Sequence, residues 1–299
     1  MIAAAGLAAA VALATLGEDL VATGAALLFR AIGGGRLEWR TPDGAWQELP
    51  LTLQLRRHWG PTDVVVVPSW TPASPGLSTA EVLLRRLPDP RPVSLVLVRV
   101  DPARWRFRVY GRPDWSRASV AELADEAGLV LAVNGPYFAE DGPLGLVVSD
   151  GVVRNRQGSR RAAHFLVRSA DGGPVVVNEK LTPVSGIDQG FQGFPAVMSA
   201  GRTFGYLRTG GRGFSVREAD RRTAACIDNT GHTVLLATDT WTNGVSFADL
   251  ATVLGGLGCV DAMAFDGGAS TALWLDVGGT RLNVEGLDAV PVVVGAERR

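Results

Sequence analysis

The stretch Val260-Asp-Ala-Met-Ala-Phe-Asp-Gly-Gly-Ala-Ser-Thr271 decides how this chain is interpreted. Its first half is apolar enough for a strand that is buried on both faces. Asp266 stands at the end of that strand, and the two glycines after it let the backbone turn sharply and approach a ligand closely. A similar Asp-Gly-Gly at residues 171–173 follows a polar approach and fits a plain turn. The setting of Asp266 predicts a functional loop in which Ser270 and Thr271 point to the same place as its carboxylate.

Charged side chains also stand at the ends of two neighbouring strand-like runs. Arg222 opens the predicted core strand 223–227, and Asp239 closes the predicted strand 233–238. A guanidinium at the mouth of a strand suits bidentate contact with phosphate or carboxylate, although two consecutive arginines are more often a surface pair. Trp241, beside Asp239, either lines a pocket or covers the core.

The motif Asn134-Gly-Pro-Tyr-Phe138 follows another buried strand-like run, residues 128–133. An asparagine can donate hydrogen bonds to a sugar and accept them from it, and an aromatic ring can stack on a sugar. A turn closed by a packed aromatic residue explains the same motif, and the motif alone favours that simpler interpretation.

Strand-like runs outnumber helical ones and are mostly joined by hairpin turns. The predicted strands are 93–100, 105–110, 128–133, 144–148, 164–168, 175–177, 196–198, 223–227, 233–238, 260–265 and 272–275. Two helices are predicted, at 119–127 and 247–256, because each begins with a capping serine and the first ends before a glycine. The pattern predicts an α+β fold with a large, mostly antiparallel, twisted sheet and a few flanking helices.

Composition divides the chain into three regions. Residues 1–25 begin with an uncharged Ala/Leu/Val run that is too short for a membrane span and predicts an export signal or a loose membrane anchor. A buried N-terminal helix is the alternative. Residues 26–92 are rich in Trp, Pro and Gly and predict an irregular region, and residues 93–299 predict the main domain.

Several classes of protein are excluded by composition and motifs. A formal net charge of -1 without a basic patch argues against a nucleic-acid partner. The three histidines lack metal-ligand spacing, so we expect neither a metal nor a cofactor. No nucleophile elbow, P-loop or dinucleotide-type glycine motif is present, which removes the standard serine hydrolase, kinase and dehydrogenase classes. Cys226 and Cys259 are interpreted as buried free thiols, with a disulfide as the alternative if the protein is exported and their strands are adjacent.

Taken in order, these segments resemble the phosphodiester glycosidase family. The matching runs are Val133–Phe138, Pro143–Val148, Phe191–Pro195, Arg222–Asp228, Gly244–Leu257 and Asp261–Thr271. The resemblance covers roughly residues 93–295, and the ordered set is more specific than any one motif.

The resemblance implies a hydrolase that cleaves a sugar–phosphate diester at the anomeric carbon. Its catalytic residues would be Asp266, Arg222 and Asp239, with Asp266 as nucleophile or base and Arg222 neutralising the leaving phosphate. Seven further residues would bind the substrate, namely Asn134, Tyr137, Gln192, Gly267, Gly268, Ser270 and Thr271.

The expected partner is a carbohydrate or sugar-phosphate in envelope or exopolysaccharide material, and the expected location is secreted or in the cell envelope. Two alternatives place the chain outside the enzymes. It could be a glycan-binding domain that keeps the pocket without turnover, or a structural envelope protein in which the Asp266 loop is only a tight turn.

Overall fold

Antiparallel pairing builds the sheets in the part of the chain that the structure describes. The computed structural model describes residues 36–49, 64–156, 158, 163–168, 173–178, 181, 186–204 and 218–299. All strand pairs within these residues are antiparallel. The expectation of a largely antiparallel architecture is therefore confirmed.

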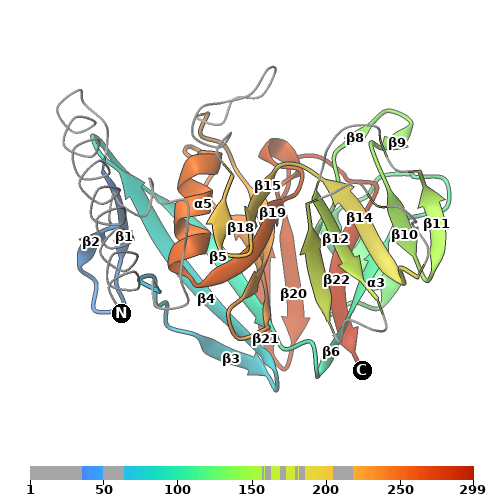
Figure 1. Ribbon diagram of the computed structural model, residues 1–299, viewed down its shortest axis with the longest axis horizontal. Coiled ribbons are helices and arrows are strands. Elements are labelled where there is room, and N and C mark those ends of the chain that lie inside the picture. Colours follow the sequence, from blue (N-terminus) through green and yellow to red (C-terminus); the bar gives the residue numbers. More distant parts are fainter. Residues whose placement is uncertain are drawn as a thin grey trace, which may run out of the picture.

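The largest sheet has ten strands and holds most of the elements that carry the site (Figure 1). In spatial order they are β16 (Arg202–Thr203), β15 (Ala196–Ser199), β19 (Cys259–Ala264), β17 (Thr223–Asp228), β18 (Thr233–Thr238), β5 (Asp89–Val100), β4 (Leu77–Arg86), β1 (Leu37–Arg40) and β2 (Trp46–Glu48), with β3 (Thr71–Ser74) paired to β4. β17 lies between β18 and β19, so it is a central strand and nearly all of its residues are buried.

Two five-stranded sheets and one two-stranded sheet accompany it in the described part of the chain. One has the order β11 (Val152–Asn155), β10 (Val147–Ser149), β14 (Gln189–Gly193), β12 (Ala163–Val167), β13 (Pro174–Val177). The other has the order β21 (Thr280–Val284), β20 (Leu273–Val277), β7 (Leu131–Asn134), β22 (Val293–Arg298), β6 (Trp105–Tyr110). A small hairpin joins β8 (Phe138–Ala139) to β9 (Gly142–Pro143).

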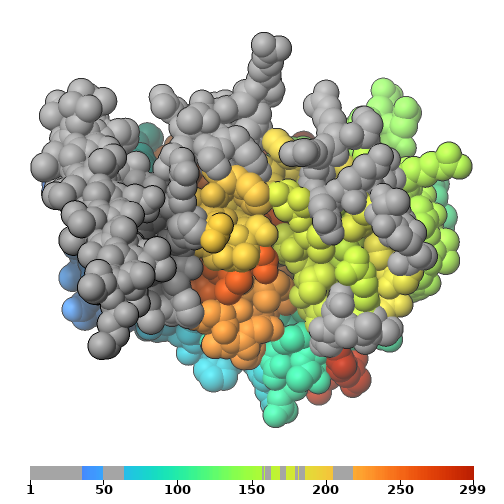
Figure 2. All heavy atoms as spheres, in the orientation of Figure 1, coloured from blue at the N-terminus to red at the C-terminus, as the bar shows by residue number. Residues whose placement is uncertain are grey.

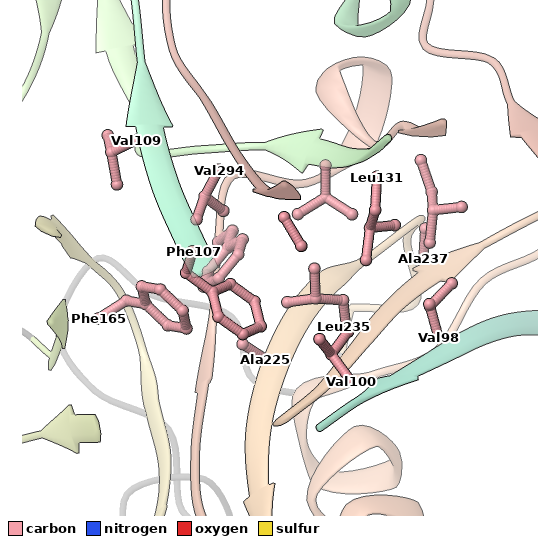
Figure 3. Close-up of a cluster of buried hydrophobic side chains, with 14 of the residues drawn as sticks. Val98, Val100, Phe107, Val109, Leu131, Phe165, Ala225, Leu235, Ala237 and Val294 are labelled. Atoms are coloured by element: carbon pink, nitrogen blue, oxygen red, sulfur yellow. The ribbon is translucent and has the colours of Figure 1, made fainter. Parts of the chain in front are cut away.

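The main hydrophobic core lies between the large sheet and the two smaller ones (Figure 3). Ala225 and Leu235 come from the large sheet and meet Val294 of β22 and Phe165 of β12. Burying such side chains contributes ~25 cal/mol per Å² of apolar surface removed from water, so this layer holds the three sheets together.

Two α-helices occur in the described part of the chain, and each packs on one of the sheets (Figure 1). α5 (Phe247–Gly256) packs on the large sheet, and in Figure 2 its orange atoms lie beside the yellow-green atoms of the second sheet. α3 (Val120–Ala127) packs on the third sheet. Ser119 caps α3 with a complete capping box to Glu122, and Gly128 ends it with φ +69.

The fold is mostly β, which corrects the predicted α+β class. The expected irregularity of residues 26–92 also differs from the structure, since β4 and β5 form a long hairpin across residues 77–100 and β1 to β3 pair alongside it. The predicted export signal or anchor at 1–25 lies outside the described residues. Among the described residues, no helix has the length and apolar character needed to cross a membrane.

The two cysteines form a disulfide, and the preference for free thiols was wrong. β17 and β19 are neighbours in the large sheet, which brings Cys226 and Cys259 to a Cα–Cα distance of 5.8 Å and an S–S distance of 2.09 Å. Both residues are buried beneath α5. Strand adjacency, which the sequence did not reveal, decided between the two alternatives.

Candidate active site

The loop after β19 holds Asp266 between the ends of β7 and β17. The backbone N–H of Asp266 donates to the carbonyl of Gly135 at 3.1 Å, and that of Gly268 donates to the carbonyl of Arg221 at 2.8 Å. Gly268 has φ +61, and a Cβ there would lie 3.2 Å from Oδ2 of Asp220. Glycine at this position therefore lets the Asp220 carboxylate lie directly against the loop.

The carboxyl group of Asp266 has a pKa raised to about 6. Burial is the largest cause, and the negative charges of Asp288 and Asp220 add to it. Hydrogen bonds from Ser270 and from the Gly267 N–H, the latter 2.9 Å from Oδ1, oppose the shift. A carboxyl group that titrates near neutral pH is suited to act as a base or a nucleophile.

Tyr137 lies among the same charges. Burial raises the pKa of its phenol to about 12; the negative charges of Asp266 and Asp220 raise it further, and the positive charge of Arg222 opposes them. The phenol therefore keeps its proton at neutral pH and is available as a hydrogen-bond donor. Because these three charges act on one phenol, the structure places Tyr137, Asp266 and Arg222 in one part of the molecule.

Arg222 is a buried guanidinium held in one orientation. Its Nε donates to the Val245 carbonyl at 3.1 Å and its Nη2 to the Glu218 carbonyl at 2.7 Å, while its Cζ lies 3.8 Å from the centroid of the Phe247 ring. Nη1 lies 3.7 Å from where a Cβ on Gly267 would stand and makes no hydrogen bond to the described residues. Burial lowers the pKa of Arg222, but an arginine remains charged at any physiological pH.

Asp220 supplies a second carboxylate that sequence reasoning missed. It is exposed, forms a backbone bridge with Val245, and accepts a hydrogen bond from the Arg221 N–H at 2.8 Å. Its negative charge raises the pKa of both Asp266 and Arg222. The available signal was its place two residues before Arg222, since alternate residues of an extended chain face the same side.

Asn134 links the Asp266 loop to two strands through hydrogen bonds. It is fully buried, its Nδ2 donates to the Asp266 carbonyl at 2.8 Å, and its Oδ1 accepts from the Thr223 hydroxyl at 2.6 Å and the Ala272 N–H at 3.1 Å. The amide therefore joins β7, β17 and the Asp266 loop. The sequence predicted contact with substrate, whereas this geometry gives Asn134 a positioning role.

The remaining residues of the loop divide into two kinds. Ser270, in the short 3-10 helix η1 (Gly268–Ser270), is buried and bonds the Asp266 carboxylate. Thr271 is completely buried, and its hydroxyl finds no hydrogen-bond partner in the described part of the chain. Ser270 therefore acts on Asp266 directly, while the Thr271 side chain is enclosed in the interior.

Two predicted residues lie apart from this cluster. Asp239 is exposed, and its charge opposes the burial that lowers the pKa of Arg221. Gln192 lies on β14, where its Oε1 accepts from the N–H groups of Leu146 at 3.2 Å and Gly158 at 2.7 Å. The negative charges that act on Asp266 are those of Asp288 and Asp220, and Gln192 fastens a loop of the second sheet.

A pocket of about 340 Å³ adjoins the cluster through Asp220 and Gly268. A larger pocket of about 630 Å³ lies by the β3–β4 turn and is lined by Arg99 and His232. The larger one contains none of the predicted site residues, so size does not identify the chemistry here. The described residues contain no group of three side chains arranged to hold a metal.

The family comparison matches the segment that carries this cluster. A family model described as phosphodiester glycosidase matches residues 127–297, more than half of the 299-residue chain. The matched segment includes Tyr137, Asp220, Arg222 and Asp266. No curated protein matches the chain.

Solved structures share the fold at low sequence identity. The catalytic domain of zebrafish N-acetylglucosamine-1-phosphodiester alpha-N-acetylglucosaminidase, auto-inhibited by its pro-peptide, has a TM-score of 0.62 and 22% identity, covering 78% of this chain and 87% of that one. A hypothetical protein from Synechocystis has a TM-score of 0.56 and 16% identity, covering 78% of this chain and 64% of that one. At these identities the likeness shows a common fold.

Proposed function

Since this chain belongs to the phosphodiester glycosidase family, we propose that it hydrolyses the bond between the anomeric carbon of a sugar and a phosphodiester oxygen. Water supplies the hydroxyl group that ends on the anomeric carbon. The bridging oxygen leaves with the phosphate, which becomes a phosphomonoester. The products are a free sugar and that phosphomonoester.

The main support for the proposal is the buried carboxyl group of Asp266, which is held by the Gly267 N–H and lies in a loop against which the Asp220 carboxylate packs. Its pKa is raised to about 6, and its charge acts on the Tyr137 phenol. At neutral pH Asp266 is mostly ionised yet remains basic enough to attack the anomeric carbon or to activate water. Asp220 provides the other member of the carboxylate pair that glycoside hydrolysis normally uses. Tyr137 keeps its proton and donates a hydrogen bond to a substrate oxygen.

Arg222 acts on the leaving group. A phosphomonoester anion is a good leaving group, so neutralising its growing negative charge matters more than strong acid catalysis. The hydrogen bonds to the Val245 and Glu218 carbonyls fix the orientation of the guanidinium before substrate binds. Its Nη1 is then available to a phosphate oxygen. A preoriented cation needs no reorganisation during the reaction, which is why it lowers the barrier.

The substrate is proposed to be envelope or exopolysaccharide material outside the cytoplasm. The disulfide between Cys226 and Cys259 supports this location, because disulfides persist in oxidising compartments. A glycosyl phosphodiester is also a linkage that polymers of sugars and phosphates contain.

The test is turnover of a glycosyl-1-phosphate diester by the wild type and by Asp266→Asn. We expect the variant to lose on the order of a thousandfold in rate, since it lacks the attacking or proton-accepting carboxylate. Asp276→Asn is the matched control, because Asp276 is a surface carboxylate of β20 paired with Arg281. Near-normal turnover by a folded Asp266→Asn protein would show that Asp266 is only a turn residue. Binding of the diester without turnover by the wild type would favour a glycan-binding protein instead.

A further inference from the structure

The larger pocket, of about 630 Å³, lies apart from the Asp266 cluster and is lined by the β3–β4 turn, Arg99 and His232. β17 begins directly after Arg222 and ends at Asp228, whose carboxylate accepts a hydrogen bond from Nε of Arg99 at 2.9 Å. The pocket is therefore at the opposite end of β17 from Arg222, roughly 20 Å away along a six-residue strand. Its ligand is a separate question from the substrate of the Asp266 site.

Arg99 is held in this pocket with part of its guanidinium left for a ligand. Its Nε donates to Oδ2 of Asp228, and its Nη2 donates to the Thr230 hydroxyl at 2.7 Å. Asp228 is buried, and its Oδ1 accepts hydrogen bonds from Thr230 and from the His232 N–H, so both of its oxygens are occupied within the hairpin. Nη1 of Arg99 makes no hydrogen bond to the described residues, and its two hydrogens are therefore available.

His232 adds a ring nitrogen whose state follows from the same network. Its Nδ1 lies 2.8 Å from the Thr230 hydroxyl oxygen, and the hydroxyl hydrogen is donated to Asp228 at 2.6 Å. The hydrogen-bond network thus assigns the imidazole proton to Nδ1, and Nε2 is an acceptor without a partner in the described part of the chain. Ser78 lies opposite Arg99 in the β4–β5 register, so its hydroxyl faces the same side of the sheet.

Arg104 supplies a second guanidinium to the lining. Its stem crosses Gly76, where a Cβ would lie 2.5 Å from Cδ of Arg104, and the φ of +77 at Gly76 also favours glycine. The ion pair between Arg104 and Asp101 is 3.6 Å long, which is beyond hydrogen-bond range, and the Arg104 side chain is 62% exposed. The lining therefore contains two guanidinium groups and one carboxylate, and both guanidinium groups keep donors for an anion.

The rest of the lining suits a ring with apolar faces. Pro72, Pro75 and Leu77 line the pocket, and proline loses almost no conformational freedom when a ligand packs on it. The volume lies within the range of about 300–1,000 Å³ that is usual for small-molecule sites, which is far more than one inorganic anion fills. Sugars have apolar faces and hydroxyl edges, so the lining favours a sugar ring that carries a negative charge.

We propose that this pocket is a second, non-catalytic site that binds an acidic sugar residue. Arg99 and Arg104 hold its carboxylate or phosphate, and a ring hydroxyl donates to Nε2 of His232. The proposal does not depend on the hydrolysis proposed above. It would let the protein hold an acidic glycan at one end of the large sheet, apart from the Asp266 site.

The first experiment uses Trp105 as a reporter, because its indole N–H donates to the Pro75 carbonyl in the pocket wall at 3.1 Å. This resonance, identified by its loss in Trp105→Phe, is followed in a ¹H–¹⁵N spectrum of the full chain during titration with glucose 6-phosphate, methyl glucuronide and methyl glucoside. We expect a saturable shift with at least one of the two acidic sugars and at least tenfold weaker binding of the neutral glucoside, since charge-assisted hydrogen bonds are the stronger ones. The tighter of the two acidic sugars shows whether the site prefers phosphate or carboxylate. No saturable shift with either, or equal affinity for the glucoside, overturns the proposal.

The second experiment repeats the titration with variants. Arg104→Ala should weaken the tighter acidic sugar by about tenfold, the effect of losing one charge-assisted contact. Arg91→Ala is the matched control, because Arg91 is 63% exposed and paired with Asp89 but lies at the other end of β5 from Arg99. Arg222→Ala should keep the Trp105 shift, whereas a ligand that acts on Trp105 through the Asp266 site would lose it. An unchanged affinity in Arg104→Ala, an equal loss in Arg91→Ala or a lost shift in Arg222→Ala overturns the assignment to this pocket.

Two anions without a ring, inorganic phosphate and acetate, complete the test. Each should bind at least tenfold more weakly than the acidic sugar that carries the same group, because the apolar part of the lining then has no partner. Equal affinities would reduce the pocket to an anion site and overturn its assignment to a sugar. All of these measurements stand if no diester is hydrolysed and the proposed function fails.

Discussion

Asp266 is a residue whose placement lowers the stability of the fold at neutral pH. Its folded pKa of about 6 lies above the ordinary 3.8, so the folded protein holds this proton more tightly than the unfolded chain does. The contribution of this tighter proton binding to the free energy of unfolding is complete below pH 3.8 and is lost as the pH rises to about 6.

Asp266→Asn should therefore be more stable than the wild type above pH 6 and similar to it near pH 3.5. The gain should be about 1–2 kcal/mol at pH 7.5, allowing for the solvent contact that the side chain keeps. Urea unfolding at the two pH values measures it, with Asp276→Asn as control. A variant that is less stable at pH 7.5 would contradict the raised pKa.

Substitutions at Arg222 should separate the effect of its positive charge from that of its planar, multidentate hydrogen bonding. Arg222→Ala removes the cation and should slow turnover by about 10²–10³-fold, the loss typical of one transition-state donor. Arg222→Lys keeps a positive charge but cannot bond Val245, Glu218 and phosphate together, so its rate should lie between those of Ala and wild type. Steady-state kinetics with a thermal melt for each variant tests this order. Equal rates for Lys and Ala would mean that charge alone contributes nothing.

At the scale of elements, the buried amide of Asn134 joins strands β7 and β17 to the Asp266 loop. Asn134→Leu leaves the Asp266 carbonyl, the Thr223 hydroxyl and the Ala272 N–H without this partner inside the core. Unsatisfied buried groups cost about 1–3 kcal/mol each, so we expect a loss of at least 2 kcal/mol in the free energy of unfolding. The folded fraction should also show a lower kcat with little change in KM, because the loop loses its support. An unaffected kcat would limit Asn134 to a purely structural role.

Elements with local signals could be predicted almost to the residue. Helix α5 spans Phe247–Gly256 and strand β18 spans Thr233–Thr238, both as predicted. Their signals are contained in the segment itself, as a capping serine with an apolar face or an apolar run between turns. The same kind of local signal selected Arg222 and Asp266 as candidate site residues, because each stands at the end of such a run.

Features that depend on distant pairing could not be predicted in this way. Asp220 reaches the site because its backbone bridges Val245, and Cys226 meets Cys259 because β17 and β19 are neighbours. Asp239 stands at the end of a correctly predicted strand, yet it lies beside Arg221 rather than Asp266. Neighbouring strands are decided by packing between segments far apart in the chain, which no local pattern contains.

At the scale of the whole molecule, the disulfide fastens two central strands of the large sheet. The two cysteines are 33 residues apart, and closing a loop of that length stabilises a fold by about 3–4 kcal/mol in the chain-entropy model. The Cys226→Ala, Cys259→Ala double variant should lose an amount of this order in urea unfolding under non-reducing conditions. Equal stability with and without a reductant in the wild type would show that the bond does not form in solution.

The position of bond cleavage distinguishes a glycosidase from a phosphodiesterase. A glycosidase cleaves between the anomeric carbon and oxygen, so water oxygen must enter the sugar and never the phosphate. The measurement is hydrolysis of a glycosyl-1-phosphate diester in H₂¹⁸O by the wild type, with the phosphomonoester product analysed by mass spectrometry. We expect a phosphomonoester that carries no ¹⁸O. A phosphomonoester carrying one ¹⁸O would mean cleavage at phosphorus, and the glycosidase assignment of the Asp266 site would be wrong.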